Sequence, residues 1–169
     1  MAVHTFGNPA DIPALQKIAK KHKLLILEDC CEAHGAAIGK RKVGSFGDLA
    51  TLSFFVAHNI TTGEGGMIFT DDPALYEILI SMREFGRFTK SIGRFEYKDK
   101  VMGQYDTRYI FTRLGYIVRM TDIEAALGLA QLKKLDVLNK KRSSIVRTYE
   151  KAFKKYEAYL QLTKVAKGN

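Results

Sequence analysis

Three short polar clusters hold the side chains of this sequence that could do chemistry. They are residues 28–35 (EDCCEAHG), residues 53–58 (SFFVAH) and residues 63–66 (GEGG). Asp29 in the first cluster offers a carboxylate, and His58 in the second offers an imidazole that can act as a general base near neutral pH. Taken singly, such residues are more often a helix cap, a structural histidine and a turn. Their order and spacing together indicate one site.

Short apolar runs place these clusters at the ends of strands. Residues 24–27 are continuously apolar, which is typical of a parallel strand buried on both faces. Because ligands in open α/β sheets lie beyond the carboxyl ends of strands, Asp29 is predicted at a functional edge. A second run, residues 49–55, leads toward His58, and a strand over residues 67–70 follows the glycine turn.

Helical patterns alternate with these strands. Asp11 predicts the start of a helix that runs to Lys23, and Asp72 with Pro73 predicts one that runs to about residue 85. Residues 86–115 lack clear periodicity and are predicted to form a long loop region. The sequence Thr121-x-x-Glu124 is a capping box, which predicts a long helix that carries its apolar register through residue 138, then a further helix through residue 153. The alternation predicts an α/β fold.

The composition favours a globular protein and excludes several classes. Hydrophobic residues make up 46% and charged residues 27% of 169 residues, and no apolar run approaches the roughly 18 residues of a membrane span. The amino terminus lacks the pattern of a signal peptide, so we expect a cytoplasmic location and no membrane partner. The net charge of +9 falls in scattered short clusters, which predicts no nucleic-acid partner. Two adjacent cysteines, Cys30 and Cys31, indicate buried thiols rather than a zinc site or disulfide framework.

The three clusters, in this order and spacing, resemble the sugar aminotransferase family of the DegT/DnrJ/StrS type, which uses the fold-type-I scaffold of pyridoxal-phosphate enzymes. The resemblance runs from residues 4–7 (HTFG) through residues 119–122 (RMTD) to Arg142, and it covers less than half of a typical family chain. It implies an α/β fold, with part of a mostly parallel sheet flanked by helices that leads into a long C-terminal helix. Residues 1–120 would form a partial cofactor-binding large domain, and residues 121–169 the long helix and the start of a linker to a small domain.

The resemblance also implies roles for four residues. Asp29 matches the aspartate that faces the pyridine nitrogen and keeps the cofactor ring protonated, so that the ring can accept electrons. Glu32 stands where the family usually has a glutamine against the phenolic oxygen of the cofactor. Ser53 matches a serine that binds the cofactor phosphate. His58 stands where an aminotransferase has the lysine that forms a Schiff base with pyridoxal 5'-phosphate.

A branch of the family shares the exchange of lysine for histidine. Its members resemble nucleotide-sugar 3-dehydratases, which act on 4-keto-6-deoxysugars with pyridoxamine 5'-phosphate and use the histidine as a base. The resemblance therefore implies catalysis by His58, a nucleotide-sugar substrate, a homodimer and a place in deoxysugar or lipopolysaccharide biosynthesis. One kind within this branch binds an iron–sulfur cluster through cysteines. No cysteine follows Cys31, so we expect no cluster, and an amino-acid donor such as glutamate to regenerate the cofactor.

Two departures from the family pattern leave other interpretations open. Ile117 replaces an asparagine that usually reaches the cofactor phosphate of the partner subunit, and Glu32 changes the local charge. The alternatives are a sugar aminotransferase relative with altered chemistry and a truncated, non-catalytic binding or interaction piece. The preserved set of Asp29, Ser53 and His58 favours the dehydratase. We also expect an uncovered apolar face, and with it a tight dimer or poor solubility.

Overall fold

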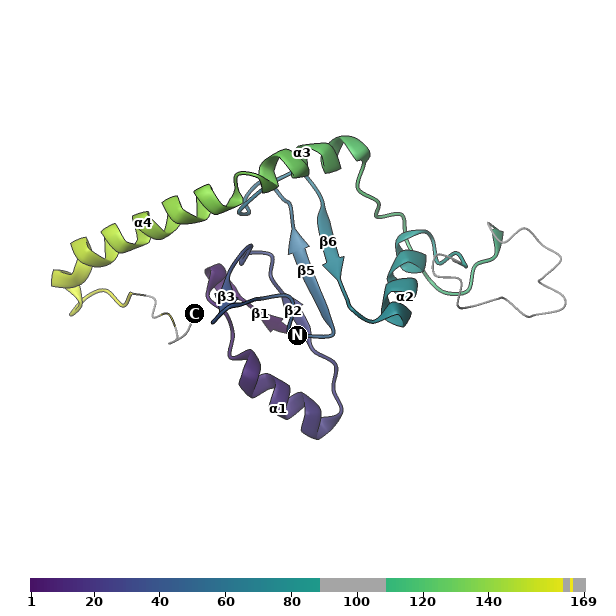
Figure 1. Cartoon of the computed structure of the whole chain (residues 1–169), viewed down its shortest axis with the longest axis horizontal. Helices are drawn as coiled ribbons and strands as arrows, with labels where there is room; N and C mark the ends of the chain where they lie inside the picture. The colour runs from purple at the N-terminus through teal and green to yellow at the C-terminus, as the bar shows by residue number, and fades with distance from the viewer. Residues whose placement is uncertain (89–108, 163–164, 166–169) are drawn as a thin grey trace. The chain divides into compact units, whose positions relative to one another are not determined.

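A four-stranded sheet organises the part of the chain that holds the three polar clusters. The computed structural model describes residues 1–88, 109–162 and 165. The sheet has the order β1-β2-β5-β6, in which β1, β2 and β5 are parallel and β6 is antiparallel to β5 (Figure 1). The strands are β1 (Ala2–Val3), β2 (Leu27–Asp29), β5 (Leu49–Ser53) and β6 (Gly66–Phe69), with a separate hairpin of β3 (Ala37–Ile38) and β4 (Arg41–Lys42). The helices are α1 (Ile12–His22), α2 (Pro73–Arg83), α3 (Asp122–Leu132) and α4 (Leu135–Phe153), with 3-10 turns at Thr5–Gly7 and Lys154–Tyr156.

The chain forms two compact units. The first contains residues 1–69 and 122–169, and therefore the whole sheet, α1, α3 and α4. The second contains residues 70–121, with α2 and the described part of the predicted loop region. There Gly86 and Gly115 approach closely, since a Cβ on Gly115 would lie 2.2 Å from the Gly86 nitrogen. The rest of that predicted loop, residues 89–108, lies outside the described residues. The domain boundary expected at residue 120 remains a prediction.

Helix α1 begins where the sequence predicts, and the strand after it begins later. The Asp11 carboxylate caps the helix by accepting a hydrogen bond from the Ala14 nitrogen at 3.0 Å. Lys23 ends it in the left-handed conformation, and the Leu24 nitrogen still bonds to the Ala19 oxygen of the helix. The predicted strand start at residue 24 is therefore wrong, because this turn leaves Leu24 59% exposed and only Leu27 onward pairs with its neighbours.

The C-terminal part of the first unit contains two helices, α3 and α4, which are separated within the region where the sequence predicts one continuous helix. Helix α3 follows directly on Thr121 but ends at Leu132, and α4 starts afresh at Leu135. The expected first helix through residue 138 is therefore too long. The Lys134 nitrogen bonds to the Gln131 oxygen, a tight turn that separates the helices. In Figure 1 the carboxyl end of β5 points toward α3, and Thr62, in the segment after β5, lies 3.0 Å from the Cβ position of Gly128 in α3.

A buried carboxylate stands at the centre of the first unit. Glu28 is completely buried, and its oxygens accept hydrogen bonds from the backbone nitrogens of Gly44, Phe46 and Gly47 at 2.9, 2.7 and 2.6 Å. The His4 Nε2 atom lies 3.0 Å from the same carboxylate. The His4 Nδ1 atom accepts from the Ala10 nitrogen, so the ring is neutral and Nε2 carries the proton. Backbone dipoles and a neutral imidazole, rather than a cation, therefore stabilise the charge of Glu28.

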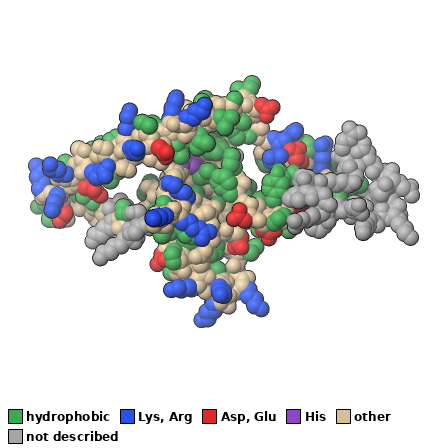
Figure 2. Space-filling view, in the orientation of Figure 1, with side chains coloured by type: hydrophobic (Ala, Val, Ile, Leu, Met, Phe, Trp, Pro, Cys, Tyr) green, Lys and Arg blue, Asp and Glu red, His purple; other side chains and the backbone are tan. Residues whose placement is uncertain are grey.

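Large apolar side chains lie exposed on the same unit. They cover β6 and the faces of α3 and α4, and hydrophobic atoms reach the surface over the region of β5 and β6 in Figure 2. Ile68 is 50% exposed, and Leu127 is 44% exposed. Large apolar side chains exposed together on one unit are typical of a face that another protein surface covers. Among the described residues, no helix combines the length and apolar character needed to cross a membrane.

Removing the buried carboxylate should destabilise the fold strongly. Replacing Glu28 by alanine leaves three backbone N–H groups and the His4 ring without an acceptor in a buried place. We expect the free energy of unfolding to fall by about 3–5 kcal/mol, measured by urea denaturation followed by circular dichroism.

The matched control is Glu64→Ala, because Glu64 is exposed. This variant should stay within about 0.5 kcal/mol of the parent. Similar losses in the two variants would contradict the central role of Glu28.

Candidate functional site

Asp29 is the last residue of β2, at the carboxyl edge of the parallel strands. One carboxylate oxygen accepts a hydrogen bond from the Cys31 nitrogen at 3.0 Å. Hydrogen bonds from Cys31 hold the pKa of Asp29 below its ordinary value despite partial burial. Asp29 is therefore an ionised carboxylate at neutral pH, at the edge where the sequence placed it.

The alternation of side chains along the strands separates Asp29 from Glu28. Asp29 pairs in register with Thr51 of β5, so the two side chains share one face of the sheet, and Glu28 points to the other. Ser53 lies two residues beyond Thr51 and on the same face. Its hydroxyl oxygen accepts a hydrogen bond from the Phe55 nitrogen at 3.2 Å, and the residue is half-buried. Asp29 and Ser53 thus end neighbouring strands at the same edge.

The two cysteines follow Asp29 in a tight turn. Cys30 is buried, and its nitrogen bonds to the Thr51 oxygen at 2.9 Å. Burial, aided by the charges of Glu28 and Asp29, raises the pKa of Cys30 to about 12. Burial and the Asp29 hydrogen bond also raise the pKa of Cys31. Both are free thiols, and their raised pKa values keep them protonated at neutral pH. The prediction of thiols beside a strand end is confirmed, although Cys31 is only half-buried.

Glu32 makes a contact that the sequence did not predict. Its carboxylate accepts a hydrogen bond from the Phe6 nitrogen at 2.6 Å, which ties the turn after β2 to the turn after β1. Phe6 has a positive φ of 55°, which is uncommon for a bulky residue, and its side chain is 84% exposed. One oxygen of Glu32 is therefore engaged by the chain itself.

His58 lies in a short turn after β5, beside a second imidazole. The His58 nitrogen bonds to the Phe55 oxygen at 3.0 Å, and the ring meets the edge of Phe55. The Nδ1 atom of His58 is buried and has no hydrogen-bond partner among the described residues. The ring is thus held by packing and keeps a nitrogen available for other chemistry.

The second imidazole is His34, for which the sequence predicts no role. The residue is 4% exposed, its ring stacks on Phe54, and both ring nitrogens lack partners within the described part of the chain. Burial, with smaller electrostatic contributions from His58 and Arg142, lowers the pKa of His34 from 6.5 to about 4. His34 is therefore neutral at physiological pH. Its only sequence signal was its place in the first polar cluster.

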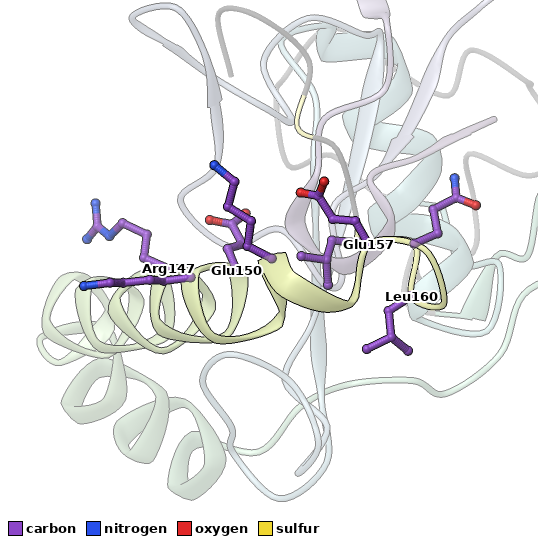
Figure 3. Close-up of a pocket in the computed structure, with 8 residues that line it drawn as sticks. Arg147, Glu150, Glu157 and Leu160 are labelled. Atoms are coloured by element: carbon purple, nitrogen blue, oxygen red, sulfur yellow. The ribbon is translucent and has the colours of Figure 1, made fainter.

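Strand pairing thus places Asp29 and Ser53 at one edge of the sheet, His58 follows Ser53 by five residues, and His34 lies within electrostatic range of His58. Ile117, the departure noted above, belongs to the second unit, where it bridges to Glu84 and is 51% exposed. A surface hollow occurs elsewhere, beside the C-terminal end of α4 (Figure 3). Its wall includes Arg147 and Glu150 of α4, and no predicted site residue lines it.

Comparison with known proteins identifies the class to which this arrangement belongs. A family model described as the DegT/DnrJ/EryC1/StrS aminotransferase family matches residues 1–168. The chain belongs to this family, and the resemblance inferred from the polar clusters is confirmed.

Individual relatives narrow the comparison. The chain is 39% identical over 153 residues to the lipopolysaccharide biosynthesis protein RfbH of Salmonella typhimurium, covering 85% of this chain and 35% of that protein. It is 38% identical over 137 residues to GDP-4-keto-6-deoxy-D-mannose 3-dehydratase of Yersinia pseudotuberculosis, covering 80% of this chain and 35% of the relative. The chain therefore spans about a third of the length of these relatives.

A solved structure supports the fold. The Escherichia coli GDP-4-keto-6-deoxy-D-mannose-3-dehydratase with bound hydrated PLP superimposes with a TM-score of 0.77 at 33% identity, covering 90% of this chain and 39% of the other. The predicted α/β fold class, a mostly parallel sheet with flanking helices of the pyridoxal-phosphate aminotransferase type, is confirmed.

The neutral state of His34 should be visible as a pH dependence of stability. Between about pH 6.5 and pH 4 the unfolded chain binds a proton at this residue that the folded chain does not. The free energy of unfolding should therefore decrease as the pH falls through this window. In His34→Gln this part of the slope should disappear, as measured by urea denaturation at several pH values.

Exposed His22 supplies the control for this experiment, because His22→Gln should keep the parental slope. Equal slopes in the parent and in His34→Gln would show that His34 titrates normally.

Proposed function

We propose that this protein is a nucleotide-sugar 3-dehydratase that acts on a 4-keto-6-deoxysugar and uses His58 as its base. The observation that carries the proposal is the position of His58. It follows Ser53 by five residues, where an aminotransferase would have lysine, and Ser53 and Asp29 end neighbouring parallel strands on the same face of the sheet. A 3-dehydratase is also among the relatives of the chain.

The residues present fit pyridoxamine 5'-phosphate or pyridoxal 5'-phosphate. Asp29 is an ionised carboxylate on the site face of the sheet, as a protonated pyridine nitrogen requires. Ser53 has a hydroxyl at the adjacent strand end, which can donate a hydrogen bond to a phosphate oxygen. His58 has a buried ring nitrogen without a partner among the described residues. Glu32 completes the proposed set beside the phenolic oxygen, and its carboxylate also anchors Phe6.

The chemistry then divides between the cofactor and the chain. When bound, the cofactor supplies an amine and an electron-accepting ring. Asp29 stabilises the positive charge at the ring nitrogen, and Ser53 holds the phosphate. His58 cannot form the stable imine that lysine forms, but its neutral imidazole can take a proton on a ring nitrogen and release it near neutral pH. This division favours removal of the C3 hydroxyl over transamination.

The same proposal extends to partners and location. We propose a homodimer, because the exposed apolar side chains of β6 and α3 need a covering surface. An amino-acid donor such as glutamate would regenerate the cofactor, because residues 59–169, which follow His58 here, include no cysteine that could hold an iron–sulfur cluster. We place the protein in the cytoplasm, in deoxysugar or lipopolysaccharide biosynthesis, in line with the relative from Salmonella.

The decisive experiment compares the two cofactor forms. We expect saturable binding of pyridoxamine 5'-phosphate in a near-ultraviolet titration, and no single lysine trapped by borohydride reduction with pyridoxal 5'-phosphate. In His58→Lys, reduction should trap residue 58 stoichiometrically, as located by mass spectrometry. The control is His22→Lys, because His22 is exposed on α1 and distant lysines should not react selectively.

Turnover tests the assigned roles. His58→Gln should lower the rate of water loss from a nucleotide-linked 4-keto-6-deoxyhexose by about 10²- to 10⁴-fold, because the general base is gone. Asp29→Asn should weaken cofactor binding. Stoichiometric trapping of one native lysine would instead return the protein to the aminotransferase class. Absence of binding by either cofactor form would refute the proposal for this chain.

A further inference from the structure

Two side chains of α4 join turns that are far apart in the sequence. The Asn139 Nδ2 atom donates a hydrogen bond to the His34 oxygen at 2.7 Å, and its Oδ1 atom accepts one from the Asn59 Nδ2 atom at 3.4 Å. Arg142 donates to the Asn59 oxygen at 3.1 Å and approaches the Asn139 Oδ1 atom at 3.5 Å. All four residues belong to the first compact unit. Side chains on one turn of α4 thus bond to residues that lie 80 to 105 positions earlier in the sequence.

The turns that α4 joins are those of the proposed site. Asn59 directly follows His58, and His34 lies five residues after Asp29, in the segment between β2 and β3. Gly35 shows how close the helix lies to this turn. A Cβ added to Gly35 would lie 3.0 Å from the Asn139 Nδ2 atom, and its φ of 87° also disfavours any other residue. The helix therefore packs directly on the backbone of one turn and bonds to the backbone of the other.

The contacts of Asn139 and Arg142 are complementary in chemistry. An amide offers both a donor and an acceptor, so Asn139 can bond to a carbonyl on one turn and to an amide on the other. The guanidinium of Arg142 presents several donors in a rigid fork, which allows it to hold Asn59 and approach Asn139 together. Its charge also lies near the His34 ring and contributes to keeping that ring neutral.

We propose that Asn139 and Arg142 form a clamp that sets the position of His58 relative to Asp29. This inference rests on the proposed function of His58. The two α4 residues touch neither cofactor nor substrate in this scheme, so they are positioning residues. Without the clamp, the turn of His58 would depend on the Phe55 contact and its own backbone bonds. A misplacement of about 1 Å in such a base can cost on the order of 10²-fold in rate.

The test separates positioning from general stability. Three variants remove parts of the clamp. Asn139→Leu removes all its amide bonds, Asn139→Asp keeps an acceptor but replaces the donor to His34 by a carboxylate oxygen, and Arg142→Leu removes the guanidinium. Lys141→Leu is the matched control, because Lys141 is an exposed neighbour on α4. Nitrogen-15 spectra of the four histidine rings, assigned with the single His→Gln variants, report the His58 environment directly. Cofactor affinity and single-turnover dehydration are measured on the same proteins.

We expect the clamp variants to shift the His58 ring resonances and to lower the single-turnover rate about tenfold or more. The affinity for pyridoxamine 5'-phosphate should change less than twofold. Asn139→Asp should give an intermediate effect, which keeps the test valid if Asn139→Leu does not fold. Lys141→Leu should match the parent in every measurement.

If the His58 ring resonances and the single-turnover rates of all clamp variants match those of the parent, the proposal that Asn139 and Arg142 position His58 is wrong. Failure of the proposed function looks different, because the parent itself would then bind no cofactor or release no water. In that case the ring spectra still decide whether α4 positions His58.

Discussion

Four donors converge on the buried carboxylate of Glu28, and the candidate site depends on them. Three are backbone N–H groups from residues 44–47, and the fourth is the Nε2 proton of His4. These bonds join the end of β1, β2 and the loop before β5. Without them, these segments would be connected mainly by the pairing of strands that are only two to five residues long. A carboxylate in such a buried place is stable only when its oxygens are fully satisfied. The network therefore fixes β2 in one orientation, and that orientation exposes Asp29 on the other face.

The site that results combines two kinds of restraint. Strand pairing places Asp29 beside Thr51 and Ser53 beyond it, so the carboxylate and the hydroxyl have little freedom. The imidazoles of His34 and His58 lie in turns, where only side-chain packing and the contacts of α4 restrict them. The rigid part corresponds to the groups that would hold a cofactor, and the less restricted part to the group that would move a proton. Tertiary contacts matter most for that second part.

Local patterns in the sequence were sufficient for some of these features. Asp29 at a strand end followed from the apolar run before it, and the Asp11 cap located the start of α1 within one residue. The run itself was misassigned at residue 24, because a left-handed Lys23 extends the helix turn and no periodicity reveals it. The break between α3 and α4 was missed for a similar reason, since the apolar register continues across it.

The interactions that assemble the site were beyond the sequence. Three partners of Glu28 come from a loop 16 to 19 residues away, His4 lies 24 residues away, and Asn139 reaches a turn 105 residues away. A carboxylate next to the predicted Asp29 looked like part of the same polar cluster, although the strand turns it to the opposite face. Contacts between residues so far apart in the sequence can be recognised only in the folded chain. The same holds for His34, whose neutrality arises from burial rather than from any neighbour in sequence.

The adjacency of Glu28 and Asp29 constrains how this protein family can change length. Successive residues of a strand face opposite sides, so deleting or inserting one residue in β2 would exchange the two carboxylates. Glu28 would then face the candidate site and lose its backbone donors, and Asp29 would face the buried side of the sheet. Insertions and deletions should therefore be rare in β2 of related chains. They should be tolerated in the β3–β4 hairpin, where a Cβ on Gly39 would meet no atom within 4 Å. A gap in β2 in a sequence comparison would mark a chain that lacks this arrangement of the two carboxylates.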